Sequence, residues 1–187
     1  MKVSSGYAIG VLVSLFVLVL VGALSFNSHF PVLVFAGENS VGTWMSGVLL
    51  IFCAAICLSI SMTKRWYPWL PLTLFFFLLA FDERFMIHER IKEWILFSSV
   101  RPSRWLYELP VVIGAVIGGI VALIVWRHTR GGSRLLLLAA VVCGLASVAI
   151  DILAAGVLLE ECFKLLAELL VASLLLRTHS RATHSSS

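Results

Sequence analysis

The stretch LPLTLFFFLLAFDERFMIHERIKEW, residues 70–94, joins an uncharged apolar run to a segment crowded with charged residues. A helix that begins near Tyr67 and rises about 1.5 Å per residue would carry Asp82 about 22 Å along its axis. That position lies in the outer part of a hydrocarbon core about 30 Å thick. The junction therefore marks either the exit of a helix from a membrane or a polar site built inside the membrane.

The composition indicates a membrane protein made of helices. The chain has 187 residues, of which 60% are hydrophobic, against about 45–50% in a typical soluble domain. Long uncharged runs of this kind predict an all-α, polytopic transmembrane bundle with membrane lipids around it. The net charge of +4 comes from short basic clusters between apolar runs. This is the pattern of cytoplasmic loops, and it does not indicate a nucleic-acid partner.

We predict six membrane spans within a single transmembrane domain over residues 1–176. The last two spans form one apolar run too long to cross a bilayer once, so we expect a turn at Gly156. One long bent helix in a five-span protein is the alternative. The first span could instead be a cleaved signal peptide, although its apolar core is longer than usual. The expected spans are 7–26, 41–62, about 66 into the quoted stretch, 107–126, 134–155 and 157–176.

The loops predict an orientation. In a six-span arrangement the basic clusters fall on one side, and residues 27–40 contain neither Lys nor Arg, so both termini are expected in the cytoplasm. We expect residues 88–98 to form an interfacial amphipathic helix and residues 177–187 to form a disordered polar tail. The small residues Gly114, Gly118 and Ala122 predict a helix-packing face for a homo- or hetero-oligomer.

Three separate segments are expected to bring acids to one depth of the membrane. Asp82, Asp151 and Glu161 reach a similar height, and such acids repel one another unless a cation, a proton or a basic residue neutralises them. Glu168 is expected deeper, near the middle of the membrane. Lys164 lies four residues before it, so the two form either a structural ion pair or part of a relay.

A metal site is one interpretation of these acids. The predicted ligands are Asp82, His88, Glu89, Asp151 and Glu161. A continuous helix would place Asp82, Glu89 and Glu93 on one face. Several carboxylates with one imidazole suit zinc, iron or manganese. A bound metal would activate water, with Glu83 or Glu160 as the proton acceptor, and the substrate would be a lipid or a similar amphiphile.

Two motifs resemble known families. Asp82-Glu83-x4-His88-Glu89 resembles the DExxxxHE motif of a group of uncharacterised bacterial multi-pass membrane proteins, in which a Glu-Glu pair recurs in the last helix. The pair Glu160-Glu161 stands in that context here. This resemblance implies a bacterial inner (cytoplasmic) membrane protein and no particular activity.

The second motif, Glu160-Glu161-Cys162-Phe163-Lys164, is similar to the EExxK motif of PrsW-like and CAAX-protease-like intramembrane peptidases. Those families carry histidines within later helices, and this chain ends after the motif's helix without one. The sequence therefore leaves three functions open. They are a metal-dependent hydrolase embedded in the membrane, a proton or cation transporter that uses Lys164 and Glu168, and a structural or assembly subunit of a membrane complex.

Overall fold

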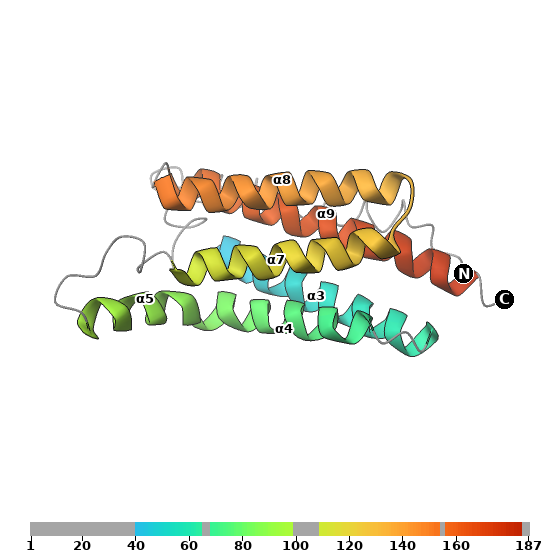
Figure 1. Ribbon diagram of the computed structural model, residues 1–187, viewed down its shortest axis with the longest axis horizontal. Coiled ribbons are helices and arrows are strands. Elements are labelled where there is room, and N and C mark those ends of the chain that lie inside the picture. Colours follow the sequence, from blue (N-terminus) through green and yellow to red (C-terminus); the bar gives the residue numbers. More distant parts are fainter. Residues whose placement is uncertain (1–39, 65–67, 99–108, 154–155, 185–187) are drawn as a thin grey trace.

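The described part of the chain is a bundle of long helices (Figure 1). The computed structural model describes residues 40–64, 68–98, 109–153 and 156–184. Within these ranges the regular structure is helix and there is no strand, which confirms the all-α prediction. The first predicted span, residues 7–26, lies outside the described residues.

Three of the described helices are long and apolar enough to cross a membrane, and they correspond to the second, fourth and fifth predicted spans. They are α3, α7 and α8. The third and sixth predicted spans also form helices, α4 and α9, and residues 88–98 fall within α5. The bounds are α3 Val41–Lys64, α4 Trp69–Phe85, α5 Ile87–Ser98, α7 Leu109–His128, α8 Gly132–Leu153 and α9 Val157–His184.

The turn predicted at Gly156 separates α8 from α9. Gly156 has a φ of +136°, a conformation open to glycine because it has no Cβ. After this turn α9 runs back alongside α8 (Figure 1). Residues 134–153 and 157–176 therefore lie in two helices packed against each other, and the alternative of one long bent helix does not hold.

Helix α9 continues eight residues beyond its predicted end at Leu176. Residues 177–184 are helical, where the sequence predicted a disordered tail. Thr178 Oγ1 donates a hydrogen bond to the carbonyl oxygen of Leu174, and the His179 ring lies 2.9 Å from Ser59 Oγ on α3. Arg181 donates to the carbonyl oxygen of Arg130. Two of these three polar residues thus contact neighbouring segments, and these contacts stabilise the added turns of α9.

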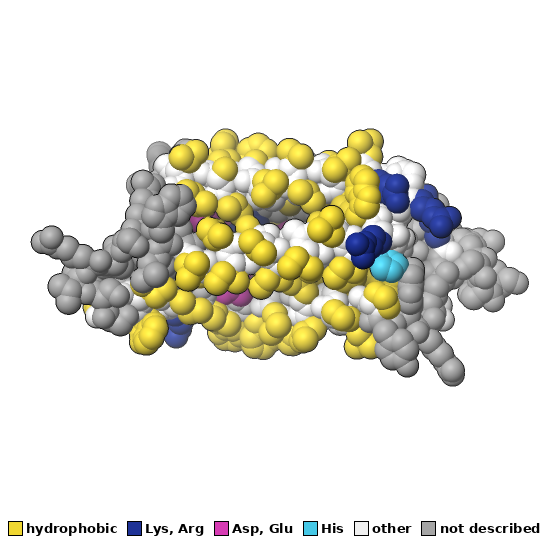
Figure 2. Space-filling model, in the orientation of Figure 1, with side chains coloured by type: hydrophobic (Ala, Val, Ile, Leu, Met, Phe, Trp, Pro, Cys, Tyr) yellow, Lys and Arg dark blue, Asp and Glu magenta, His cyan; other side chains and the backbone are white. Residues whose placement is uncertain are grey.

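The core lies where α3 packs against both α4 and α9. From α3 it contains Cys53, Cys57 and Ile60, and from α4 it contains Trp69 and Leu72, all of them at most 2% exposed. The α9 contribution includes Leu165, Ala172, Leu174 and Leu175. The outer faces of the helices are also apolar, and hydrophobic side chains cover most of the visible middle of the molecule (Figure 2). An apolar surface of this extent is expected of a protein surrounded by lipid.

One end of the bundle carries a cluster of exposed basic side chains, whereas acids and basic residues, among them Arg84 and Lys164, lie together toward the other end. Lys and Arg gather at the end where α7 is followed by α8 (Figure 2), and exposed Arg127, Arg130 and Arg134 come from this turn. The opposite end contains the end of α4, the end of α8 and the beginning of α9 (Figure 1). The acids of these segments therefore come to one end, as the sequence predicted.

Candidate functional site

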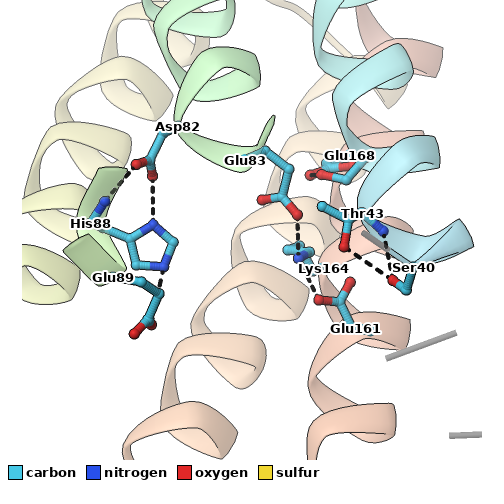
Figure 3. Close-up of polar contacts among 10 residues, drawn as sticks. Ser40, Thr43, Asp82, Glu83, His88, Glu89, Glu161, Lys164 and Glu168 are labelled. Carbon is cyan, nitrogen blue, oxygen red and sulfur yellow. Dashed lines mark hydrogen bonds and ion pairs between the residues drawn. The ribbon is translucent and has the colours of Figure 1, made fainter. Parts of the chain in front are cut away.

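A break between α4 and α5 divides the acids of the quoted stretch into two groups. Helix α4 ends at Phe85, and Met86 adopts the left-handed conformation (φ 49°, ψ 47°) before α5 begins at Ile87. Asp82 and Glu83 reach different neighbours, Asp82 the residue His88 on α5 and Glu83 the residue Lys164 on α9 (Figure 3). The expected continuous face of Asp82, Glu89 and Glu93 is therefore wrong, because Met86 interrupts the helix.

The first group is formed by Asp82, His88 and Glu89. Asp82 Oδ1 accepts a hydrogen bond from the His88 backbone N–H at 2.8 Å, and Asp82 Oδ2 lies 2.9 Å from His88 Nδ1. His88 Nε2 is 3.4 Å from Glu89 Oε1. Asp82 thus binds the first turn of α5, where an acidic side chain is favourable. The three side chains are 30–42% exposed, so water reaches this group.

The second group links α4 to α9 through Lys164. Its ammonium Nζ donates to Glu83 Oε1 at 2.8 Å and to Glu161 Oε1 at 2.6 Å. The side chains are 24%, 15% and 11% exposed in the order Lys164, Glu83, Glu161. The sequence suggested an ion pair between Lys164 and Glu168. The ammonium instead pairs with Glu161, one turn in the other direction along α9, and with Glu83 from α4.

Glu168 lies next to this ion triad and is buried. Ser46 Oγ on α3 donates a 2.6 Å hydrogen bond to Glu168 Oε1. The other carboxyl oxygen, Glu168 Oε2, is buried and has no hydrogen-bond partner among the described residues, and the same is true of Glu161 Oε2. Buried polar atoms nearly always have a partner. We call Glu83, Glu161, Lys164 and Glu168 the buried acid cluster (Figure 3).

The five predicted metal ligands do not come together. Asp82, His88 and Glu89 form the group at α5, Glu161 belongs to the buried acid cluster, and Asp151 is half-buried near the end of α8. Across the described ranges, no three His, Cys, Asp or Glu side chains are grouped so that they could hold a metal ion. The binding of zinc, iron or manganese stays a prediction.

The two proton acceptors predicted for the metal site also separate. Glu83 accepts a hydrogen bond from Lys164. Glu160 lies in the first turn of α9 and is half-buried. Ser46 was not predicted at all. A serine in an apolar helix carries no sequence signal of its own, and only the packing of α3 on α9 identifies it as the partner of Glu168.

Comparison with known proteins adds a family without an assigned activity. No curated protein and no solved structure matches this chain. Residues 6–178 match the family described as a domain of unknown function, DUF8692, and the chain therefore belongs to this family.

Proposed function

We propose that the chain is a multi-pass protein of the bacterial inner membrane that carries protons through the buried acid cluster, with Glu168 as the central carrier. The observation that supports this proposal is the state of the Glu168 carboxyl group. It is only 9% exposed, it accepts one hydrogen bond from Ser46, and its second oxygen has no partner among the described residues.

Charge balance in the cluster favours a proton on Glu168. Three carboxyl groups surround one ammonium group, and that ammonium already contacts Glu83 and Glu161. An unbalanced charge in the middle of a membrane costs about 2.5–3.5 kcal/mol or more. A proton removes the charge of Glu168, and its reversible gain and loss is the elementary step of a relay. The charged groups that act electrostatically on Glu168 are Lys164 and Glu161 on α9 and Glu83 on α4.

The spacing of the acids favours protons over one chelated metal ion. Glu168 follows Glu161 by seven residues, which is about 10 Å along a helix axis. Metal–ligand bonds are about 2.0–2.6 Å long, so one ion does not bridge these two carboxyl groups while both keep their places. Lys164 also lies between them on α9. Proton transfer does not require the carboxyl groups to meet at one point, because each acid binds its own proton.

A second candidate function uses the group at α5. Asp82 holds the His88 ring through Nδ1, which is how a carboxylate orients a histidine that binds a metal. A metal-dependent reaction on a lipid-like substrate would use His88 and Glu89 at this partly exposed position. Elemental mass spectrometry of the purified protein tests this candidate. Stoichiometric metal in the unmodified protein that is lost in His88→Ala would support this candidate. Unmodified protein that contains no metal would reject it.

Proton carriage is tested in liposomes that contain the purified protein. A pH gradient is imposed, and the decay of the gradient is followed with a dye trapped inside. We expect proton flux in the unmodified chain, its loss in Glu168→Gln, and its retention in Glu93→Gln, which changes an exposed carboxyl group on α5. Absence of flux from well-folded unmodified protein, or equal flux in Glu168→Gln, would refute the proposal.

A further inference from the structure

The ammonium group of Lys164 occupies a position suited to a small cation. Oxygen atoms of Glu83 on α4 and Glu161 on α9 approach Nζ to 2.8 Å and 2.6 Å. Two carboxylate groups from different helices thus converge on one positive centre that is largely shielded from water (Figure 3). Lys164 is in effect a cation tethered to the chain inside a site lined by carboxylate oxygens.

The cluster also contains oxygen atoms that lack a donor. Glu161 and Glu168 are 8% and 9% exposed, and in the described part of the chain the Oε2 atom of each is buried without a hydrogen-bond partner. Such atoms are normally bonded to a donor, to water or to an ion. In Figure 3 the two carboxyl groups lie on either side of Lys164. The site therefore offers more oxygen ligands than its one ammonium group uses.

Lys164 has a third acid within reach, in addition to Glu83 and Glu161. Glu161 precedes it by three residues and Glu168 follows it by four, and side chains at these spacings are neighbours on a helix. The flexible four-carbon stem of lysine allows the ammonium to move between such neighbours. When it moves to Glu168, the carboxylates of Glu83 and Glu161 lose their positive partner and become available to another cation.

We propose that a monovalent alkali cation takes the place of the Lys164 ammonium between Glu83 and Glu161, in exchange for the proton of Glu168. This inference rests on the proposed function and adds the ion that is exchanged for protons. The cation would enter as the ammonium moves to the Glu168 carboxylate, whose O–H bond breaks and whose proton passes to water.

The charges balance for a monovalent ion. Before the exchange the cluster contains two carboxylates, one ammonium and one protonated acid, so its net charge is −1. After the exchange it contains three carboxylates, one ammonium and one bound cation, and its net charge is again −1. A divalent cation would bring the net charge of the cluster to zero, so charge alone does not exclude it. Magnesium, however, dehydrates reluctantly and calcium takes six to eight oxygen ligands, whereas this position is lined by two carboxylates and is largely shielded from water. The small number of carboxylate ligands and the limited access of water therefore favour alkali ions over magnesium or calcium.

The exchange is tested in liposomes with an acidic interior and a trapped pH dye. Lithium, sodium or potassium chloride is added outside, with choline chloride and magnesium chloride as controls. We expect at least one alkali chloride to accelerate proton release about tenfold or more over choline, as the gain of charge-assisted contacts implies. Magnesium chloride should match choline. Glu161→Gln should reduce the rate with the alkali salt to the choline rate, whereas Glu93→Gln should not.

A second measurement uses only the unmodified protein, so that a folding defect in Glu161→Gln does not decide the result. A cation that binds the folded protein raises its thermal unfolding midpoint, so we expect a higher midpoint in the effective alkali chloride than in choline chloride of equal concentration. An unchanged midpoint would overturn the cation site. Equal proton release in alkali and choline salts would overturn the exchange and leave proton carriage standing. No proton release in any salt would overturn both proposals.

Discussion

Replacing Lys164 with methionine removes the positive partner of two buried carboxylates and keeps most of the apolar stem. Glu83 and Glu161 would then face each other with no ammonium between them, in side-chain positions that are 15% and 11% exposed. Removal of one partner from a buried ion pair typically costs about 3–5 kcal/mol. At about 1.4 kcal/mol per factor of ten, we expect the ratio of folded to unfolded protein to fall roughly a hundredfold to several thousandfold.

The assay is reversible unfolding in mixed detergent micelles, followed by the loss of helical circular dichroism. The matched comparison is the triple variant Lys164→Met, Glu83→Gln, Glu161→Gln, which removes the charges together. Because it leaves no buried unpaired carboxylate, it should regain most of the lost stability. A loss below about 1 kcal/mol in Lys164→Met would be typical of an exposed pair and would refute the buried triad. A triple variant no more stable than Lys164→Met would refute the electrostatic reason for the loss.

Three further changes test other parts of the structure. Ser46→Ala removes the hydrogen bond to Glu168 and should lower the free energy of unfolding by about 1–3 kcal/mol in the same assay. The control is Ser133→Ala, which removes a buried hydroxyl that has no hydrogen-bond partner among the described residues. This control should lower the free energy of unfolding by less. Asp82→Ala removes both contacts to His88, and we expect faster hydrogen exchange in the first turn of α5, with a cap loss of about 0.5–2 kcal/mol; unchanged exchange would contradict the cap. Gly156→Ala places a Cβ at a φ of +136° and should destabilise by about 1–3 kcal/mol, so an unchanged unfolding midpoint would show that this turn is not strained.

The arrangement of the helices was largely predictable because it depends on local properties of the sequence. Apolar length identified α3, α7 and α8, and the length limit of a membrane span together with Gly156 identified the turn before α9. The break at Met86 was not predictable in this way. No glycine or proline lies between residues 81 and 94, and a non-glycine residue with positive φ is uncommon. The added residues of α9 depend on partners in other segments.

The site was predictable in its residue types and not in its pairings. Glu83, Glu161, Lys164 and Glu168 could be singled out because charged residues in apolar helices are costly. Helical spacing alone places Lys164 equally near Glu161 and Glu168. In the structure Glu83 on α4 draws the ammonium group toward Glu161. No sequence pattern predicts which side of α4 carries the Glu83 carboxylate toward α9. The metal ligands were predicted from depth, and depth fixes only one of the three coordinates that an ion requires.

The most direct test of proton carriage asks whether Glu168 gains and loses a proton inside the bundle. Infrared difference spectra of the purified protein, recorded between acidic and alkaline buffer, detect the carbonyl band of a protonated carboxyl group and its shift in heavy water. We predict a band that is present in the unmodified chain and in Glu93→Gln and is absent in Glu168→Gln. Identical carbonyl bands in the unmodified chain and in Glu168→Gln would contradict the role of Glu168 as a proton carrier.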